Sequence, residues 1–396
     1  MSFRELWDTL APIGRDPGTG GYLRYSWTAA DRACRTWFVE QAERRDLLVE
    51  TDNNGNLWAW RGDPAAGDAV VTGSHLDSVP HGGGYDGPLG IVSAFLALDA
   101  LRGKGFHRPL GIVAFTEEEG ARFGMACLGS RLLCGMVDAR AAGGLRDRDG
   151  ISLLEAMRAA GELDGTLGAS PNLLSRIGCF VELHIEQGRA LDAPVGVATS
   201  IWPHGRWRFD FAGMGNHAGT TRMGDRRDPM LTCAYTVLAA NKAARLNGGV
   251  ATVGRVQPHP NATNAVPESV SAWLDARAPD EPLLSGLVAG IAGRARERAD
   301  RDGTTVTVTE ESRSPRTTFD PDLRDRIAAV LGNPPLLPTG AGHDAGVLAG
   351  VLPTAMLFVR NPTGVSHAPG EAATDDDCEA GVAALTAVLE ELACRP

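Results

Sequence analysis

Long apolar runs are absent from this 396-residue sequence. None approaches the roughly 18 consecutive apolar residues of a membrane-spanning helix, so we expect no membrane partner. The first ten residues, MSFRELWDTL, also lack the cationic flank, apolar core and small-residue cleavage site of a secretory signal. We therefore expect a cytoplasmic protein.

Cysteine pairs and excess positive charge are missing too. The seven cysteines are odd in number and form no CxxC motif, which indicates reduced, mostly buried thiols. The formal net charge of −11, without a basic stretch, argues against a nucleic-acid partner. No GxSxG motif occurs, and the glycines at 82–84 lack the Lys and Ser/Thr of a phosphate-binding loop.

The length favours two domains, because single cores stop growing at about 250–300 residues. Short apolar runs typical of buried strands lie at both ends of the chain and predict an α/β domain. These runs are 69–73, 109–115, 179–183 and 354–359. Residues 47–60 predict a hairpin, 135–177 a helical surface excursion and 376–392 a final helix.

The composition changes near residues 202–205, and a different order of elements follows. The patterns predict strand (206–212), helix (225–246), strand (250–257), strand (268–277), helix (281–299) and strand (304–311). This βαββαβ order is that of a ferredoxin-like unit. We therefore expect a domain at 204–314 inserted into a first domain made of 1–203 and 315–396.

Potential metal ligands gather where the predicted strands end. Among them are His75, Asp86, Glu119, His184 and His367. In an open α/β sheet, ligands bind at the carboxyl ends of the strands. These five side chains supply two imidazoles and a bridging carboxylate for one ion, and one imidazole and two carboxylates for another. Three protein ligands per ion leave a position for water, which is typical of a catalytic site. We predict that Asp86 bridges two metal ions.

Three adjacent carboxylates follow the strand at 109–115. A solvated turn is one interpretation of Glu117, Glu118 and Glu119. The alternative divides their roles, because neighbouring side chains on an extended segment point in opposite directions. One carboxylate would then bind metal while the next accepts a proton from the activated water.

Three residues of the predicted inserted domain are candidates for contacting a substrate. His217, in GNHAGTT, and Asn264 could polarise a carbonyl if a domain or subunit brings them to the metals. Arg277 could bind a carboxylate through two hydrogen bonds, although an exposed strand end is the simpler interpretation. Arg360 is a competing anion binder.

The segment GAGHDA at 340–345 fits the GxGxxA pattern of dinucleotide-binding proteins. In those proteins the pattern follows a strand and opens a helix. Here it follows the proline-rich residues 333–338, which argues against a nucleotide.

Taken together, the motifs resemble those of the amidase/hydantoinase/carbamoylase family. The resemblance rests on HLDSV, GGGYDGPLG, EEEGARF, ELHIEQG, GNHAGTT, NATNAVP with the later DAR, GHDA and GVSHAPGE. The family is a branch of the dizinc aminoacylase and carboxypeptidase-like hydrolases. The resemblance implies a dizinc aminopeptidase-like α/β catalytic domain with an inserted ferredoxin-like domain that serves as lid and dimerisation domain.

The resemblance also implies which residues hold two divalent metal ions. His75, Asp86 and His184 would bind one ion, and Asp86, Glu119 and His367 the other. Zinc is expected from these donors, and manganese and cobalt fit the same set.

The resemblance assigns the catalytic roles to three residues. Glu118 matches the general base. His217 and Asn264 match the pair that polarises the substrate carbonyl, with His217 supplied by the neighbouring subunit of a homodimer.

Four further residues match positions that bind substrate or support the metals. Arg277 matches the residue that binds the substrate carboxylate, and Gln187 and Gly364 match other substrate contacts. Asp77 matches an aspartate that orients His75.

The implied reaction is hydrolysis of a ureido C–N bond in a small carboxylate substrate, with release of ammonia and CO₂. The segments GRDPGTGGYLRYSWTAAD and RNPTGVSH favour allantoate as the substrate. N-carbamoyl-L-amino-acid hydrolase and β-ureidopropionase are the alternatives. An aminoacylase or dipeptidase of the same clan would share the metals, and a non-catalytic metal-binding scaffold would lack Glu118, which is present.

Two departures from the family pattern affect the expected pocket. Arg222 replaces a usual proline, and Pro362-Thr363-Gly364 replaces a more typical double glycine. Both departures bear on substrate choice more than on metal binding.

Overall fold

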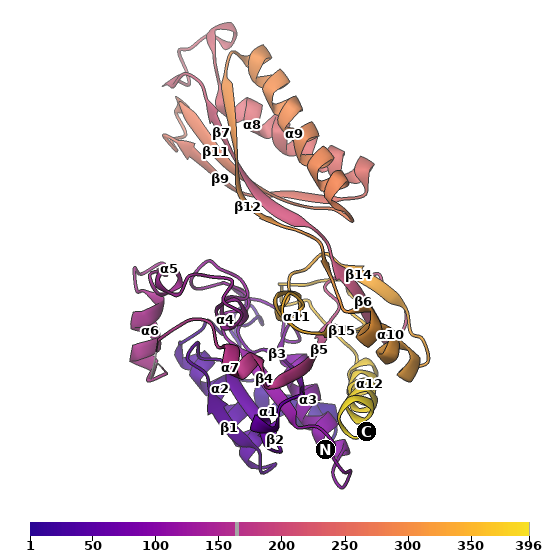
Figure 1. The fold of residues 1–396 in the computed structure, drawn as a ribbon. Helices are drawn as coiled ribbons and strands as arrows, with labels where there is room; N and C mark the ends of the chain where they lie inside the picture. The colour runs from indigo at the N-terminus through magenta and orange to yellow at the C-terminus, as the bar shows by residue number, and fades with distance from the viewer. Residues whose placement is uncertain (163–165, 396) are drawn as a thin grey trace. The chain divides into compact units, whose positions relative to one another are not determined.

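The chain divides into two compact units (Figure 1). The computed structural model describes residues 1–162 and 166–395. The first unit comprises Met1–Ser200 and the described residues from Thr318 onward, and the second comprises Ile201–Thr317. Among the described residues, no helix has the length and apolar content needed to cross a bilayer.

A nine-stranded sheet forms the centre of the first unit, with the order β1-β2-β4-β3-β5-β15-β6-β13 and with β14 beside β6. The strands are β1 (Leu48–Thr51), β2 (Leu57–Arg61), β3 (Ala69–His75), β4 (Leu110–Phe115), β5 (Ile177–Ile185), β6 (Val195–Ile201), β13 (Thr317–Thr318), β14 (Leu336–Thr339) and β15 (Thr354–Val359). The four central strands, β4, β3, β5 and β15, are parallel. Their carboxyl ends therefore meet at one edge.

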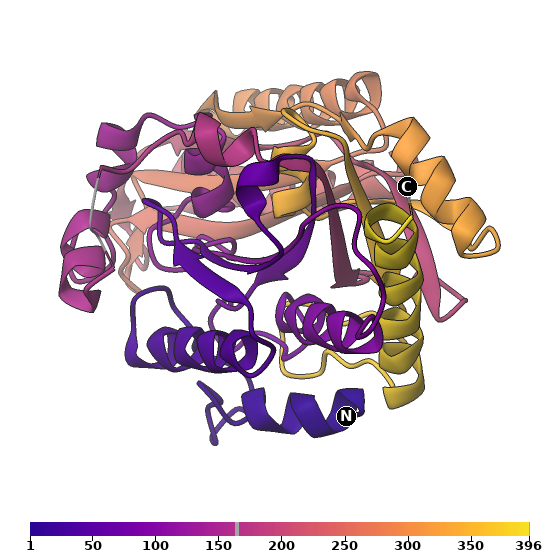
Figure 2. The same ribbon diagram turned by 60° about the horizontal axis from the view of Figure 1, so that its bottom comes forward.

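Helices cover the central strands, which are apolar and almost completely buried, as parallel strands usually are. Helices α3 (Pro88–Ala100) and α12 (Asp375–Ala393) lie side by side (Figures 1 and 2). A β-carbon on Gly90 of α3 would come within 2.3 Å of the Leu183 carbonyl oxygen of β5. Glycine thus lets the helix that follows β3 pack directly on the neighbouring strand.

Other helices complete the first unit. They are α1 (Phe3–Leu10), α2 (Ala29–Glu43), the 3₁₀ turn η1 (Pro64–Ala66), α10 (Pro321–Val330) and α11 (Asp344–Leu348). Helix α2 begins after a capping residue, because the Thr28 side chain accepts a hydrogen bond from the Asp31 N–H. The predicted hairpin at 47–60 is confirmed by the antiparallel pair β1–β2.

The predicted helical excursion at 135–177 contains short helices with a small core of their own. They are α5 (Ala139–Gly143), α6 (Leu153–Ala160) and α7 (Pro171–Leu174), preceded by α4 (Leu128–Leu133). Trp27, Phe123 and Met157 are buried in this core. Residues 163–165 of the excursion lie outside the described residues.

The second unit is a four-stranded antiparallel sheet with the order β12-β7-β11-β9. Its main elements are β7 (His204–Ala212), α8 (Pro229–Asn247), β9 (Val250–His259), β11 (Ser269–Arg277), α9 (Glu281–Asp302) and β12 (Thr305–Ser314). Short elements β8 (Asn216–His217), η2 (Met223–Asp225) and β10 (Ala265–Val266) complete it. The predicted α/β fold with an inserted βαββαβ unit is confirmed.

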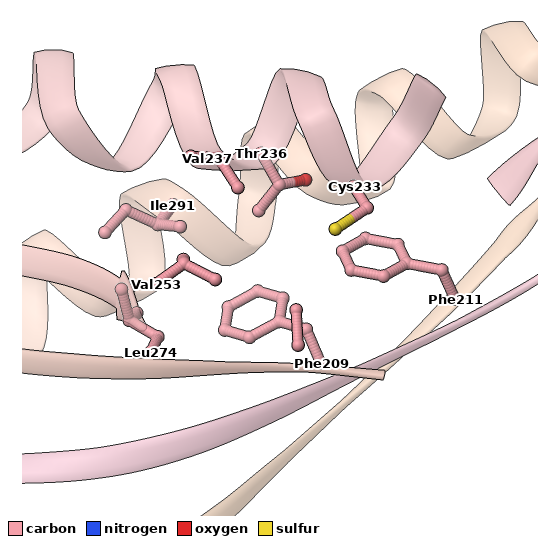
Figure 3. Close-up of a pocket in the computed structure, with 9 residues that line it drawn as sticks. Phe209, Phe211, Cys233, Thr236, Val237, Val253, Leu274 and Ile291 are labelled. Carbon is pink, nitrogen blue, oxygen red and sulfur yellow. The ribbon is translucent and has the colours of Figure 1, made fainter. Parts of the chain in front are cut away.

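Helices α8 and α9 cover one face of this sheet (Figure 1). The cavity between them and the strands measures only about 10 Å³ and is lined by apolar side chains, including Phe209, Phe211 and Ile291 (Figure 3). This volume is at the lower limit for one water molecule. The space is therefore a packing gap and too small for a substrate.

The expectation that no strand precedes the segment GAGHDA is wrong. Residues 336–339 form strand β14, and α11 begins at Asp344, so the segment GAGHDA does lie between a strand and a helix. The two prolines at 334–335 argue locally against a strand, but β14 forms because it pairs with β6 in the tertiary fold. Helix α11 has five residues, which is far shorter than the helix of a dinucleotide-binding βαβ unit.

Candidate metal centre

The five predicted metal ligands lie at the carboxyl edge of the parallel strands. His75 is the last residue of β3, and His184 is the penultimate residue of β5. Glu119 follows β4, Asp86 lies in the loop before α3, and His367 follows β15. The structure brings all five together, although His184 belongs to a strand instead of following one.

Asp86 lies at the centre of the cluster, and its two oxygens face different histidines. Oδ1 lies 3.1 Å from Nε2 of His184 and 3.6 Å from Nε2 of His75. Oδ2 lies 3.3 Å from Nε2 of His367, which in turn lies 3.4 Å from Oε2 of Glu119. The ligand atoms therefore form two trios, His75–Asp86–His184 and Asp86–Glu119–His367, that share one carboxylate.

The hydrogen bonds of the buried histidines favour metal binding through Nε2. Nδ1 of His75 lies 3.1 Å from the Asp77 carbonyl oxygen, and Nδ1 of His184 lies 2.8 Å from that of Ile185. Since a carbonyl only accepts, each Nδ1 carries the proton and donates it. Both Nε2 atoms are buried and make no hydrogen bond. These atoms, with the carboxylates beside them, fit a zinc-type cation.

A glycine allows the loop carrying Asp86 to approach His75. Gly87 has φ 86°, in the left-handed region that favours glycine. A β-carbon at this position would lie 2.6 Å from the His75 ring. The carboxylate of Glu371 fixes the same loop, because its Oε1 accepts the backbone N–H groups of Tyr85 and Asp86, both at 3.0 Å.

Charges within the cluster shift its pKa values strongly. Burial opposes ionisation of Asp86, but the histidines around it, His184 first, hold its pKa well below the usual range. Burial likewise opposes the charge on His75, but Glu118 and the neighbouring aspartates raise its pKa well above the ordinary value. The hydrogen bond to Asp86 raises the pKa of His367 to about 9. Burial, followed by the charge on Asp86, raises the pKa of Glu119 to about 7.

Asp77 links the loops after β3 and β4. Its carboxylate accepts the backbone N–H groups of Glu118 and Glu119 at 3.2 and 3.1 Å. Its Oδ1 also lies 3.5 Å from Nδ1 of His75. Asp77 thus fixes the positions of the predicted general base, Glu118, and of two predicted ligands, Glu119 and His75, relative to one another.

Glu118 is buried beside the cluster, with Oε2 3.8 Å from Nε2 of His75. Burial raises the pKa of its carboxyl well above the usual range. Glu117 is buried too, so the solvated-turn interpretation is wrong. The assumption of an extended segment is also wrong at its first residue, because Glu117 has φ 54°.

Of the predicted substrate contacts in the first unit, Gln187 lies at the cluster and Gly364 in a neighbouring turn. The Gln187 side-chain N–H group donates to Oδ2 of Asp86 at 2.9 Å and to the Ser366 hydroxyl at 3.1 Å. Gly364 has φ 66°, and its N–H donates to the Asn361 side chain at 3.0 Å.

The remaining predicted residues belong to the second unit. His217 and Asn264 are close neighbours there, since the Ala218 N–H donates to the Asn264 carbonyl at 3.0 Å. Nδ1 of His217 accepts the N–H groups of Gly219 and Thr220 at 3.0 and 3.2 Å. Nε2 of this exposed ring therefore carries the proton in the neutral form and can donate it.

Arg277, at the end of β11, forms a side-on ion pair with Asp275 in the second unit. Its Nε lies 2.9 Å from Oδ1 and its Nη2 lies 3.3 Å from Oδ2. Arg360 is likewise paired, and its role as a competing anion binder stays a prediction. Its guanidinium is engaged by Asp377 of α12, at 2.9 Å.

The sequence did not single out two buried residues that support the cluster. Glu371 fixes the Asp86 loop, and in the sequence it ends the motif GVSHAPGE, four residues after His367. The His343 ring lies 4.5 Å from the His184 ring, and its Nε2 is buried without a hydrogen bond. Burial and then the nearby positive charge of His184 hold the pKa of His343 well below its usual value.

A family model, curated proteins and solved structures all match this chain over most of its length. The model of a family described as peptidase family M20/M25/M40 matches residues 71–391. N-carbamoyl-L-amino acid amidohydrolase of Geobacillus stearothermophilus is 36% identical, over 98% of each chain. Allantoate amidohydrolase of Escherichia coli is 31% identical, over 99% of this chain and 98% of that one. A crystal structure of a hydantoinase/carbamoylase family amidase from Burkholderia vietnamiensis is similar with a TM-score of 0.89 and 32% identity, over 100% of this chain and 98% of that one.

Proposed function

Because the chain belongs to peptidase family M20/M25/M40, we propose that it is a two-metal amidohydrolase that cleaves a ureido C–N bond in a small carboxylate substrate. The predicted resemblance to the hydantoinase/carbamoylase amidases is confirmed. The chain is accordingly a hydrolase of a metal-dependent family. Two ions per subunit, zinc first, with manganese and cobalt as the alternatives, are part of the proposal.

The division of the Asp86 carboxylate between two trios is the observation that carries this proposal. His75 and His184 face one oxygen, and His367 faces the other. A structural zinc site is closed by four protein ligands, whereas each trio supplies three. Metal ions held there would polarise a substrate carbonyl and lower the pKa of a water molecule.

Glu118 is the proposed general base. It would accept a proton from the attacking water and pass it to the leaving nitrogen as the C–N bond breaks. The position of its Oε2, 3.8 Å from Nε2 of His75, supports this role because it faces the ligand cluster. Burial also favours the role, since it raises the pKa of the Glu118 carboxyl and so makes the carboxylate a stronger base.

His217 and Asn264 are the proposed donors to the substrate oxygen as it becomes negative. Support comes from the hydrogen bonds to Nδ1 of His217, which direct the proton to Nε2. Arg277 is the proposed partner of the substrate carboxylate. Its planar fork already engages a carboxylate side-on, that of Asp275, which is the geometry that a substrate carboxylate would need.

A homodimer is the proposed assembly, with the second unit as lid and dimerisation domain and His217 donated across subunits. Support comes from a stripe of exposed apolar side chains on α8, made of Leu231, Tyr235, Leu238 and Leu246. Leu238 and Leu246 are each 70% exposed. Strand β9, which packs beside α8, is an edge strand with its own exposed Val250 and Val256.

All seven cysteines are unpaired, which supports a reducing, cytoplasmic location.

Allantoate is the first proposed substrate and N-carbamoyl-L-amino acids are the second. The N-terminal segment GRDPGTGGYLRYSWTAAD favours the first. The 36% identity to an N-carbamoyl-L-amino acid amidohydrolase favours the second. β-Ureidopropionate is a third ureido candidate.

Ammonia release tests the proposal. The metal-loaded protein is assayed with allantoate, an N-carbamoyl-L-amino acid, β-ureidopropionate and an N-acyl amino acid, with and without chelator. We expect ammonia from one ureido compound, loss of activity with chelator and recovery with Zn²⁺ or Mn²⁺. Turnover of the acyl amino acid alone would contradict the proposal and favour an aminoacylase.

A further inference from the structure

The start of helix α4 is hydrogen-bonded to the segment that directly follows strand β4. The N–H groups of residues 127–129 donate to the carbonyl groups of residues 118, 117 and 116, at 2.6, 3.0 and 2.9 Å. Gly129 permits this approach, because a β-carbon there would lie 2.2 Å from the Asn56 side-chain oxygen. The segment at 127–129 therefore has a fixed position relative to the proposed general base.

Within this segment, the thiol of Cys127 reaches the Glu118 carboxylate. Sγ donates to Oε1 at 3.2 Å, and Cys127 and Glu118 are 4% and 6% exposed. Burial, followed by the nearby Glu118 charge, raises the pKa of the Cys127 thiol well above its usual range, so the sulfur keeps its proton. Among the described residues, this thiol is the one hydrogen-bond donor to that carboxylate.

We propose that Cys127 is a positioning residue whose S–H···Oε1 hydrogen bond keeps Oε2 of Glu118 turned toward His75 and the metal ligands. The inference rests on the proposed role of Glu118 as general base. Rotation about the last side-chain bond of a glutamate is soft, so a donor on one oxygen selects which oxygen faces the reacting water. Small errors in the placement of a catalytic group lower the rate markedly.

A purely structural role for Cys127 predicts different behaviour. Cys127 has φ 53° and its side chain makes no hydrogen bond to the helix that it caps. A non-glycine residue in this region is strained, and glycine adopts it freely. The variant Cys127→Gly therefore removes the thiol while relieving the backbone, which separates loss of positioning from loss of stability.

Infrared spectroscopy of the metal-loaded protein tests the contact without using activity. The difference spectrum between wild type and Cys127→Gly isolates the S–H stretching band of Cys127. We expect this band to move to higher frequency in Glu118→Gln, because an amide oxygen accepts a hydrogen bond more weakly than a carboxylate. The band of the buried Cys34, isolated with Cys34→Ala, should not move. A Cys127 band unaffected by Glu118→Gln would overturn the proposal.

Kinetics test the consequence of the contact. We expect Cys127→Gly to lower kcat about fivefold with KM unchanged, and Cys127→Ser, which keeps a donor, to stay within about twofold of wild type. Cys34→Ala is the matched control and should match wild type. A Cys127→Gly variant with wild-type kcat, or a Ser variant as slow as the Gly variant, would overturn the proposal. If the infrared band moves but wild type releases no ammonia from any ureido compound, the contact stands and the proposed function fails.

Discussion

Nε2 of His184 lies 3.1 Å from Oδ1 of Asp86, and it makes no hydrogen bond. The protons of this histidine are accounted for at Nδ1, which donates to the Ile185 carbonyl. Two acceptor atoms at this distance repel each other unless a cation or a second proton lies between them. A metal ion that binds between Nε2 and Oδ1 therefore displaces any proton held there, so metal binding at this site is coupled to proton release.

Metal binding should release protons at pH 7 and strengthen as the pH rises. The pKa values of His75 and His184 are raised in the metal-free chain, and that of His367 is raised to about 9. The His367 ring is therefore protonated at pH 7 and must lose a proton to bind metal, and the raised pKa values of the other two rings act in the same direction, so affinity falls as the pH is lowered. Calorimetric titration of Zn²⁺ in two buffers with different ionisation enthalpies measures the release. Equal heats in both buffers would contradict the prediction, and His367→Ala should release about one proton fewer.

Glu118→Gln should abolish most of the activity without removing metal. Gln has nearly the same shape and its oxygen can still accept from Cys127, but it cannot take a proton from water. We expect kcat to fall about 10²- to 10⁴-fold, with unchanged metal content and an unchanged unfolding midpoint. Steady-state kinetics and metal analysis check this. Activity within about twofold of wild type would remove Glu118 from the role of base.

Arg277→Ala should raise KM far more than it lowers kcat. The loss of a charge-assisted pair to the substrate carboxylate predicts an increase in KM of about 10- to 100-fold. Arg208→Ala is the matched control, because Arg208 lies on the same sheet and pairs with Asp210 at 2.8 Å. An Arg277 variant with the KM of the control would show that the carboxylate binds elsewhere.

Mixing two inactive variants tests whether His217 acts across subunits. Glu118→Gln and His217→Ala each damage one part of the proposed site. If His217 comes from the neighbouring subunit, a mixed dimer has one intact site, and random mixing restores about a quarter of wild-type activity. If His217 acts within its own subunit, every site in the mixture is damaged and no activity returns. Recovery is measured as ammonia release after the subunits exchange.

The sequence was most informative where potential metal ligands lie at the ends of apolar runs typical of buried strands. His75, Glu119 and His367 lie at or after apolar runs that form parallel strands, and such strands end at a common edge. The βαββαβ order of the second unit was also predictable, because its helices are long and its strands are separated by clear breaks. These features depend on local periodicity, which a single sequence contains.

The sequence was least informative where the fold joins distant segments. Glu371 accepts the backbone N–H of Tyr85 from 286 positions away, and no spacing rule predicts this contact. Strand β14 was missed because its pairing with β6 outweighs the prolines around it. The partner of Arg360 could not be predicted for the same reason, since Asp377 belongs to the packed helix α12.

Anomalous X-ray diffraction from Zn²⁺-loaded crystals tests the central claim most directly. The account predicts two zinc peaks about 3.5–4 Å apart, one bound by each oxygen of Asp86. Each peak should also contact one of the histidine groups that face those oxygens. A single peak, or two peaks of which Asp86 binds only one, would contradict it.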